Sequence, residues 1–175
     1  MFKVIALVIV AAIAALLAFA ATRPDTFRVE RRTTIQASPA KIYPLIEDFH
    51  QWAVWSPYEK LDPAMNRSYS GAARGKGAAY AWQSDGKAGA GKMLVTEATA
   101  PSAVVIQLDF VKPFEGHNIA EFTLKPEGNA TQVTWAMHGP APFISKLMGV
   151  FFDMDKMIGD DFAVGLANMK AAAER

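Results

Sequence analysis

Three histidines, His50, His117 and His138, are the side chains that change charge nearest to neutral pH in this sequence. They lie in different segments without the short spacings of metal ligands, so the sequence predicts no metal site. His138 is expected on the solvent-facing side of a strand, with Asp109 or Glu121 as a partner. A histidine–carboxylate pair there would lie outside any cavity, where no substrate is desolvated for general acid–base catalysis.

Another set of acid–base candidates consists of Tyr80, Asp109 and Glu97. These would serve a cyclase or dehydratase only if at least one of them points into a cavity and has a shifted pKa. The chain has no cysteine, no nucleophile elbow and no serine beside a base, so a covalent nucleophile is not expected. The sequence therefore predicts no catalytic site, and an enzyme is kept as the alternative to a binding protein.

A glycine-rich segment, residues 86–92, matches the first seven positions of a phosphate-binding P-loop. The eighth position, which should be Ser or Thr, is Met93, and the residues after it are typical of a strand. Phosphate binding in such a loop needs a helix N-terminus. We therefore interpret the segment as a hairpin and predict no nucleotide or other cofactor.

The size and charge of the chain limit the possible classes of protein further. Its 175 residues suffice for one domain with a hydrophobic core. Without the first 22 residues, whose only charged side chain is Lys3, the chain has 17 basic and 17 acidic residues. A neutral domain lacks the basic face that nucleic acid requires, so no nucleic-acid partner is expected.

The N-terminal segment contains 18 consecutive apolar residues, 4–21. As a helix it would be about 27 Å long, close to the hydrocarbon thickness of a bilayer. We favour a division into a transmembrane anchor, residues 1–23, and a folded domain, residues 24–175. Two other interpretations stay open: a cleaved signal peptide, with Lys3 before the apolar run and a small-x-small site at residues 18–20, and a buried globular helix.

The orientation of a single-pass anchor depends on the charges at its two flanks. Lys3 favours a cytoplasmic N-terminus, whereas the four arginines between Arg23 and Arg32 favour the reverse orientation. We expect the domain to be exported to the periplasmic side, with residues 4–21 in the membrane.

Between residues 27 and 139, short runs of alternating apolar and polar residues predict seven strands. Turn residues separate most of them after short intervals, so the strands are expected to pair mostly antiparallel. One face of the sheet is apolar, as Val104, Ile106 and Leu108 indicate, and the other face is polar. The strands are predicted near residues 27–35, 67–71, 77–84, 90–99, 102–112, 117–126 and 130–139.

Helical patterns follow the first strand and the last strand. Two short helices are predicted after the first strand: one is capped by Ser38 and shortened or bent by Pro44, and the other ends before Pro57. Residues 142–175 are predicted to contain one long helix with an apolar stripe at spacings of three and four. The stripe consists of Phe151, Met154, Ile158, Phe162, Leu166 and Met169.

The order of these elements and several short phrases of the sequence resemble a known superfamily. A strand, two small helices, six strands and a long C-terminal helix form the α+β helix-grip arrangement, in which a curved antiparallel sheet surrounds the helix. The chain is similar to the START-like or SRPBCC superfamily, which contains the birch-pollen-allergen fold and the polyketide cyclase/dehydrase and lipid-transport group. Within it, the chain resembles the branch with an N-terminal hydrophobic segment. The matching phrases are Val29-Glu30-Arg31, Ile35-Gln36-Ala37-Ser38-Pro39, Trp52-Ala53-Val54-Trp55-Ser56-Pro57, Asp62-Pro63-Ala64-Met65, Tyr69-Ser70-Gly71, Thr131-Gln132-Val133-Thr134-Trp135 and Gly159-Asp160-Asp161-Phe162-Ala163-Val164-Gly165-Leu166.

The resemblance implies a hydrophobic cavity between the sheet and the long helix, used across the superfamily for lipids, steroids or polyketides, and it implies no particular reaction. Aromatic and methionine side chains suit such a lining, although each of them alone fits an ordinary core equally well. Trp52 and Trp55 are expected to close one end, as packing anchors rather than as a gate. The predicted lining residues are Tyr80, Trp82, Phe110, Trp135, Met137, Met154, Met157 and Phe162.

These observations predict a membrane-anchored binding protein for an apolar small molecule or lipid. The ligand would lie in the cavity between the sheet and the C-terminal helix. The alternative is a cyclase- or dehydratase-type enzyme that acts on an apolar substrate in the same cavity.

Overall fold

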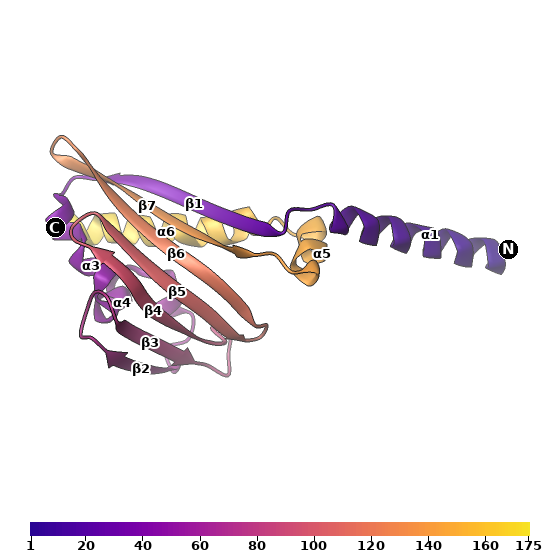
Figure 1. Ribbon diagram of the computed structural model, residues 1–175, viewed down its shortest axis with the longest axis horizontal. Coiled ribbons are helices and arrows are strands. Elements are labelled where there is room, and N and C mark those ends of the chain that lie inside the picture. Colours follow the sequence, from indigo (N-terminus) through magenta and orange to yellow (C-terminus); the bar gives the residue numbers. More distant parts are fainter.

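A computed structural model describes all residues from 1 to 175 (Figure 1). Its centre is one seven-stranded sheet in which every neighbouring pair is antiparallel. The strand order across the sheet is β1-β7-β6-β5-β4-β3-β2, so β1 and β2 are the two edges. The strands are β1 (Thr26–Ile35), β2 (Asn66–Gly71), β3 (Ala78–Gln83), β4 (Ala90–Thr99), β5 (Ala103–Lys112), β6 (Gly116–Glu127) and β7 (Ala130–Pro140).

The alternation of apolar and polar residues determines which face of the sheet is buried. Ile106 pairs with Ala120 and Ala120 pairs with Met137, and all three side chains are buried on the concave face. The sheet bends at β4, where its pairing with β5 shifts beside Gly91. A side chain on Gly91 would collide with the ring of Trp82, so a close approach requires glycine at this position.

Short helical segments connect β1 to β2 and cover one end of the core. They are α2 (Pro39–Ile42), α3 (Pro44–Glu47), α4 (Trp52–Trp55) and two 3₁₀ turns at Phe49–Gln51 and Pro57–Lys60. Trp52 and Trp55 are both buried, and their indole N–H groups donate to the carbonyl oxygens of Ile46 (3.0 Å) and Leu45 (2.7 Å). The two tryptophans are thus packing anchors within the core.

The predicted long C-terminal helix is confirmed, but it begins later than expected: residues 142–175 contain a short helix before the long one. Helix α5 (Phe143–Phe151) ends where Phe152 takes an extended conformation, and α6 (Met154–Ala173) begins after Asp153. The Asp153 carboxylate accepts a hydrogen bond from the Lys156 backbone N–H (2.9 Å), which caps the new helix. The apolar spacing continues across this break and therefore does not reveal it.

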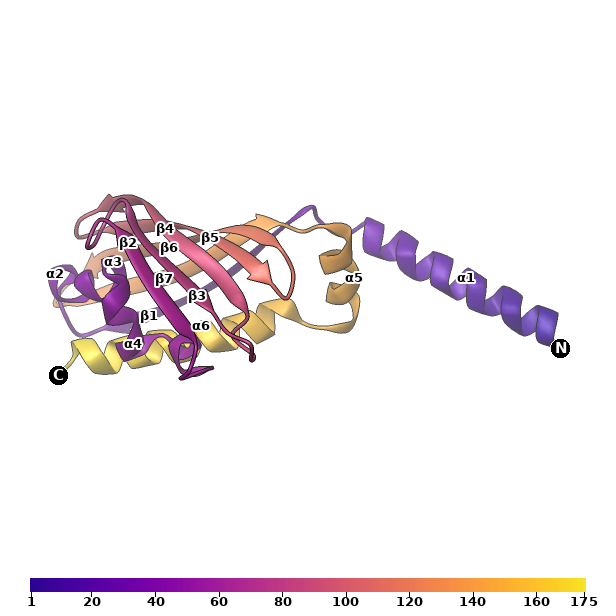
Figure 2. The ribbon, with the colours of Figure 1, turned by 90° about the horizontal axis from the view of Figure 1, so that it is seen from below.

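Helix α6 lies beneath the concave face of the sheet, alongside β1 (Figure 2). The C-terminal part of the apolar stripe is buried against the sheet, from Phe162 through Leu166 and Met169. The beginning of the stripe is not buried, because Phe151 and Met154 are exposed. Together, the curved antiparallel sheet, the short helices and α6 confirm the predicted α+β helix-grip fold.

Helix α1 (Phe2–Ala21) projects away from the domain (Figures 1 and 2). It is long and apolar enough to cross a membrane, a property that a signal sequence near the N-terminus shares. Nearly all of its residues are exposed, apart from Ala20, which is buried, and Leu16, which is half-buried. Among the helices, α1 packs against α5.

Candidate functional site

The predicted lining residues lie in three places: two neighbouring parts of the core and the exposed start of α6. In the first group, the rings of Trp135 and Phe162 stack in parallel with centroids 3.9 Å apart, and both side chains are buried. Met137 is buried in the same core, two residues further along β7. These side chains fill the space between the sheet and the C-terminal half of α6.

The second group is a row of aromatic side chains on β3 and β5. The ring of Tyr80 stacks on that of Trp82 at 6.0 Å, and Phe110 meets Trp82 edge-on at 6.0 Å. Trp82 and Phe110 are half-buried, and the Trp82 indole N–H donates to the Ala88 carbonyl oxygen (2.9 Å). This row lies on the concave face, further towards the β2 edge of the sheet than the Trp135–Phe162 stack.

The Tyr80 hydroxyl belongs to a buried polar network that was not predicted from the sequence. It donates a 2.6 Å hydrogen bond to one oxygen of Glu59, whose other oxygen accepts from the Arg67 guanidinium at 2.7 Å. The Glu59 side chain is only 7% exposed. Burial first, and then the bond to Glu59, raise the pKa of Tyr80 far above its ordinary value of 10.0, so the phenol keeps its proton and acts as a donor.

The other acid–base candidates lie outside the space between the sheet and α6. Asp109 and His117 face each other on the convex side with 2.7 Å between their polar atoms, and this hydrogen bond is the main reason why the pKa of Asp109 is lowered. Glu121 lies 3.3 Å from His138 on the same side, and Glu97 is exposed. No group of three or more such side chains is placed to hold a metal ion.

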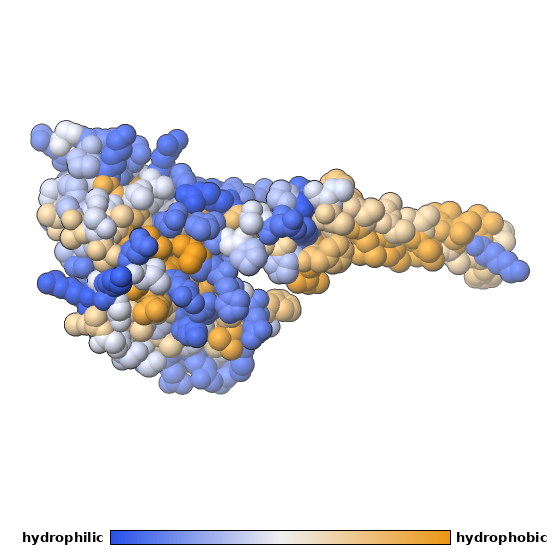
Figure 3. Space-filling model, in the orientation of Figure 1, coloured by the Kyte–Doolittle hydropathy of each residue, from blue (hydrophilic) through white to orange (hydrophobic).

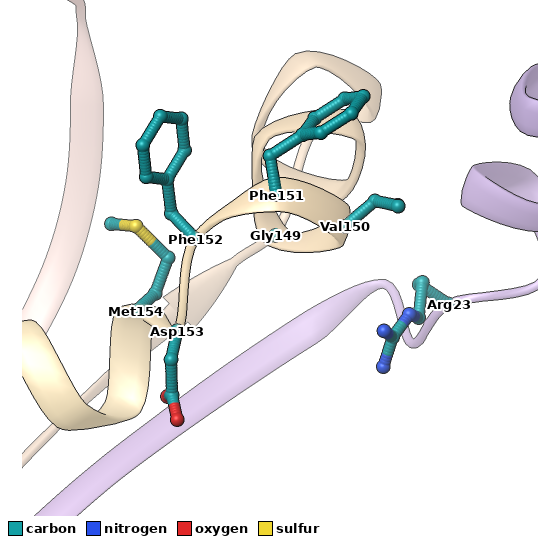
Figure 4. A pocket seen from close by; sticks show the side chains of 7 residues that line it. All are labelled: Arg23, Gly149, Val150, Phe151, Phe152, Asp153 and Met154. Atoms are coloured by element: carbon teal, nitrogen blue, oxygen red, sulfur yellow. The ribbon is translucent and has the colours of Figure 1, made fainter.

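An open pocket of about 420 Å³ lies at the break between α5 and α6 (Figure 4). Val150 and Phe151 point to the side where Arg23 lies, and Phe152 and Met154 point to the other side of the turn. We call it the junction pocket, and its lining residues are Arg23, Gly149, Val150, Phe151, Phe152, Asp153 and Met154. Met154 is the only member of the predicted lining set that belongs to it.

A second pocket of about 240 Å³ adjoins the junction pocket and shares Arg23, Gly149 and Met154 with it. It reaches between the first residues of β1 and the start of α6, where Phe27 and Ile158 form part of its wall. The two pockets therefore lie at the open end of the space between sheet and helix. Met157, the last of the predicted residues, is 57% exposed and lines neither pocket.

The charged groups at these pockets differ in how far they are already paired. Lys146 forms a 2.5 Å ion pair with Asp25, and Asp153 is engaged as the cap of α6. The Arg23 guanidinium forms no ion pair within the protein and lies 5.1 Å from the centre of the Phe19 ring. The second pocket has mainly apolar walls, whereas the walls of the junction pocket are more polar and carry both the Arg23 guanidinium and the Asp153 carboxylate. Arg23, which lines both pockets, can pair with an anionic or polar group on an apolar ligand.

These pockets were not predicted from the sequence, because the apolar spacing indicates an unbroken helix across the residues that form them. The two signals for the break were Asp153, a favoured N-cap residue, and Gly149, four residues before it. Glu59 and Arg67 gave no usable signal, because their partnership with Tyr80 exists only once β2 and β3 are paired.

Comparison with known proteins gives one family match and many structural ones. The family described as "Polyketide cyclase / dehydrase and lipid transport" matches residues 26–174. Among the curated proteins, none matches the sequence.

The solved structures that resemble this chain share its fold at low sequence identity. A protein from Chromobacterium violaceum is 16% identical, with a TM-score of 0.60 over 87% of this chain and 99% of that chain. The Aha1 dimer from Colwellia psychrerythraea is 21% identical, with a TM-score of 0.61 over 85% of this chain and 96% of that one. Ara h 8.0201 is 10% identical, with a TM-score of 0.55 over 85% and 97%. At these identities the likeness is one of fold alone.

Proposed function

Because the chain belongs to the polyketide cyclase/dehydrase and lipid transport family, we propose that it is a membrane-anchored protein that binds an apolar small molecule or lipid. The observation that carries the proposal is the pair of adjoining pockets at the open end of the helix grip. Their walls come from the link between α1 and β1, the start of β1, helix α5, the turn after it and the start of α6. No candidate acid or base among Tyr80, Asp109 and Glu97 lines them, so the geometry supports binding rather than catalysis.

The ligand class follows from the chemistry of the lining. Val150, Phe151 and Phe152 offer apolar surface for a hydrocarbon chain or ring system, and Met154 adapts to varied shapes. Arg23 supplies a fixed positive charge beside this surface, which favours a ligand with a carboxylate or phosphate at one end. An anionic amphiphile such as a fatty acid combines both features.

The anchor places this site at a membrane. Helix α1 has 20 residues and would span about 30 Å, which matches the hydrocarbon core. Helix α1 packs on α5, and cleavage of α1 as a signal peptide would expose the part of α5 that this contact covers, which supports an uncleaved anchor. We propose that residues 4–21 remain in the membrane and that the domain lies on the exported side.

A pocket-filling substitution tests the binding proposal. Gly149 lines both pockets, and a Cβ built on it meets nothing within 4 Å, so Gly149→Leu fills the pocket without distorting the fold. We expect the full-length chain, released from detergent micelles in a mass spectrometer, to retain an added fatty acid. The Gly149→Leu variant should lose it, and Arg23→Gln should lose its preference for the fatty acid over the fatty alcohol of equal length.

The matched control is Ala163→Leu, which places the same leucine side chain on the exposed side of α6. This control should retain the fatty acid like the unaltered chain. Equal retention by the unaltered chain, Gly149→Leu and Ala163→Leu, or no retention by the unaltered chain with any membrane lipid extract, would contradict the proposed function.

A further inference from the structure

Helix α5 exposes an unusual amount of apolar surface for a helix of a folded domain. None of its nine residues is buried, and Lys146, its one charged side chain, is neutralised by Asp25. The large apolar side chains at 143, 144, 148 and 151, and Phe152 just after the helix, are all exposed, with Phe151 at 64%. An exposed apolar surface of this size indicates a partner that covers it.

The position of α5 relative to α1 identifies that partner. The two α1 residues that are not exposed, Leu16 and Ala20, lie one helical turn apart near its end, where α1 packs on α5. Figures 1 and 2 both show α5 beside this end of α1. Leu16 lies about 9 Å along the axis from Thr22, where the helix stops, at a rise of about 1.5 Å per residue.

This spacing sets the depth of α5 once α1 spans a bilayer. A helix that packs against the last 9 Å or so of a membrane-spanning helix lies at the boundary between headgroups and acyl chains. Amphipathic helices that lie on a membrane insert their apolar face to about 5–10 Å at this same boundary. The exposed phenylalanines of α5 would therefore contact lipid and not water.

Two further features of the surface agree with contact between this end of the domain and lipid. Figure 3 shows the apolar surface of α1 continuing onto the adjoining part of the domain. The connection between β5 and β6 points to the same end of the molecule as α5 in Figures 1 and 2, and it carries Phe114, which is 68% exposed.

We propose that α5 is an interfacial helix that lies in the surface of the same bilayer that α1 spans, so that the junction pocket opens directly onto the lipid. This inference rests on the anchor of the proposed function and adds the route of the ligand. An apolar ligand enters along α5 from the acyl-chain region and reaches the pocket between Phe152 and Met154 without crossing water.

The absence of cysteine from the chain allows a clean test with the full-length protein. Single cysteines replace Ile144 and Phe151 on α5, Val10 in the middle of α1, and Leu94 on the convex face of β4; all four side chains are exposed, so the substitutions leave the core intact. Each protein carries a nitroxide label and is placed in vesicles of phosphatidylcholine and phosphatidylglycerol. Collision rates of the label with oxygen and with a water-soluble nickel complex then report its surroundings.

We expect the ratio of oxygen to nickel collisions at Ile144→Cys and Phe151→Cys to be severalfold higher than at Leu94→Cys and to approach that at Val10→Cys. If position 10 is in lipid while positions 144 and 151 behave like position 94, the interfacial helix is wrong and the anchor stands. If position 10 itself is in water, the proposed anchor fails as well. Shielding of 144 and 151 from both reagents, with spectral broadening from a neighbouring label, would show that a second copy of the chain covers α5 instead.

Discussion

At the scale of single residues, Gly165 allows the ring of Trp135 to lie against the backbone of α6. A Cβ at this position would lie 2.8 Å from a ring carbon of Trp135 and 3.1 Å from Pro57. Trp135 cannot retreat, because its other face is stacked on Phe122. Alanine is the better helix former by about 1 kcal/mol, but overpacking a rigid core costs about 1–3 kcal/mol.

We therefore expect Gly165→Ala to lower the free energy of unfolding by about 1–2 kcal/mol despite its higher helix propensity. Thermal melts followed by circular dichroism measure this change. Gly149→Ala is the matched control, since it also replaces a helical glycine but has open space around the new methyl group. Gly149→Ala should leave the stability unchanged or raise it. An equal rise in both variants would show that the core relaxes around a methyl group beside Trp135.

At the scale of elements, the edge of the sheet formed by β2 and β3 is tied to the short helical segments by Glu59. This residue lies in the 3₁₀ turn Pro57–Lys60 and binds Arg67 on β2 and Tyr80 on β3. A buried ion pair adds little net stability compared with apolar residues, but removal of one partner leaves an uncompensated charge. Glu59 therefore determines where the edge strands lie more than it determines how stable the domain is.

Glu59→Gln should destabilise the domain by up to about 3–5 kcal/mol, because the Arg67 guanidinium is then left without a counter-charge. The double variant Glu59→Leu, Arg67→Leu should recover much of that loss. Arg74→Ala is the control: its pair with Glu47 is long, at 3.9 Å, and the Arg74 side chain is 68% exposed, so little change is expected. If the stability lost by the double variant equals the sum of the losses from its two substitutions made separately, the two residues are not coupled.

At the scale of the whole molecule, helix α1 and the rest of the chain share very little core. The buried apolar cluster runs from Val29 to Ala173, and the only buried residue of α1 is Ala20. A chain that begins at residue 24 should consequently fold with a melting temperature close to that of the full-length chain, compared in the same detergent. Loss of a cooperative melting transition in the truncated chain would show that α1 is part of the folding unit.

The overall architecture could be predicted from the sequence because it depends on local periodicity. Alternation such as that of Val104, Ile106 and Leu108 places seven strands within a few residues of their observed bounds, and the family match confirms the superfamily that the short phrases indicated. Pro44 separates α2 from α3, as its lack of an N–H predicts.

The site was harder to predict because it depends on where an element stops. An apolar stripe does not show whether the backbone continues through Phe152, so Met154 and Met157 were expected inside a cavity and lie exposed at the helix start. The lining role of the predicted set remains a prediction. Contacts between distant residues, such as Glu59 with Tyr80, follow from strand pairing and bend, which a single sequence does not specify.

The link between α1 and β1 consists of only four residues, 22–25, and it is held in place by Asp25 through its carbonyl oxygen to the Ala141 N–H (2.7 Å) and through its ion pair with Lys146. Even fully extended, four residues reach no more than roughly 14 Å. With α1 in a bilayer, the domain stays at the surface of that bilayer and cannot carry a ligand across an aqueous compartment by diffusion. The proposed binding site therefore meets only ligands that lie in that bilayer or arrive at its surface.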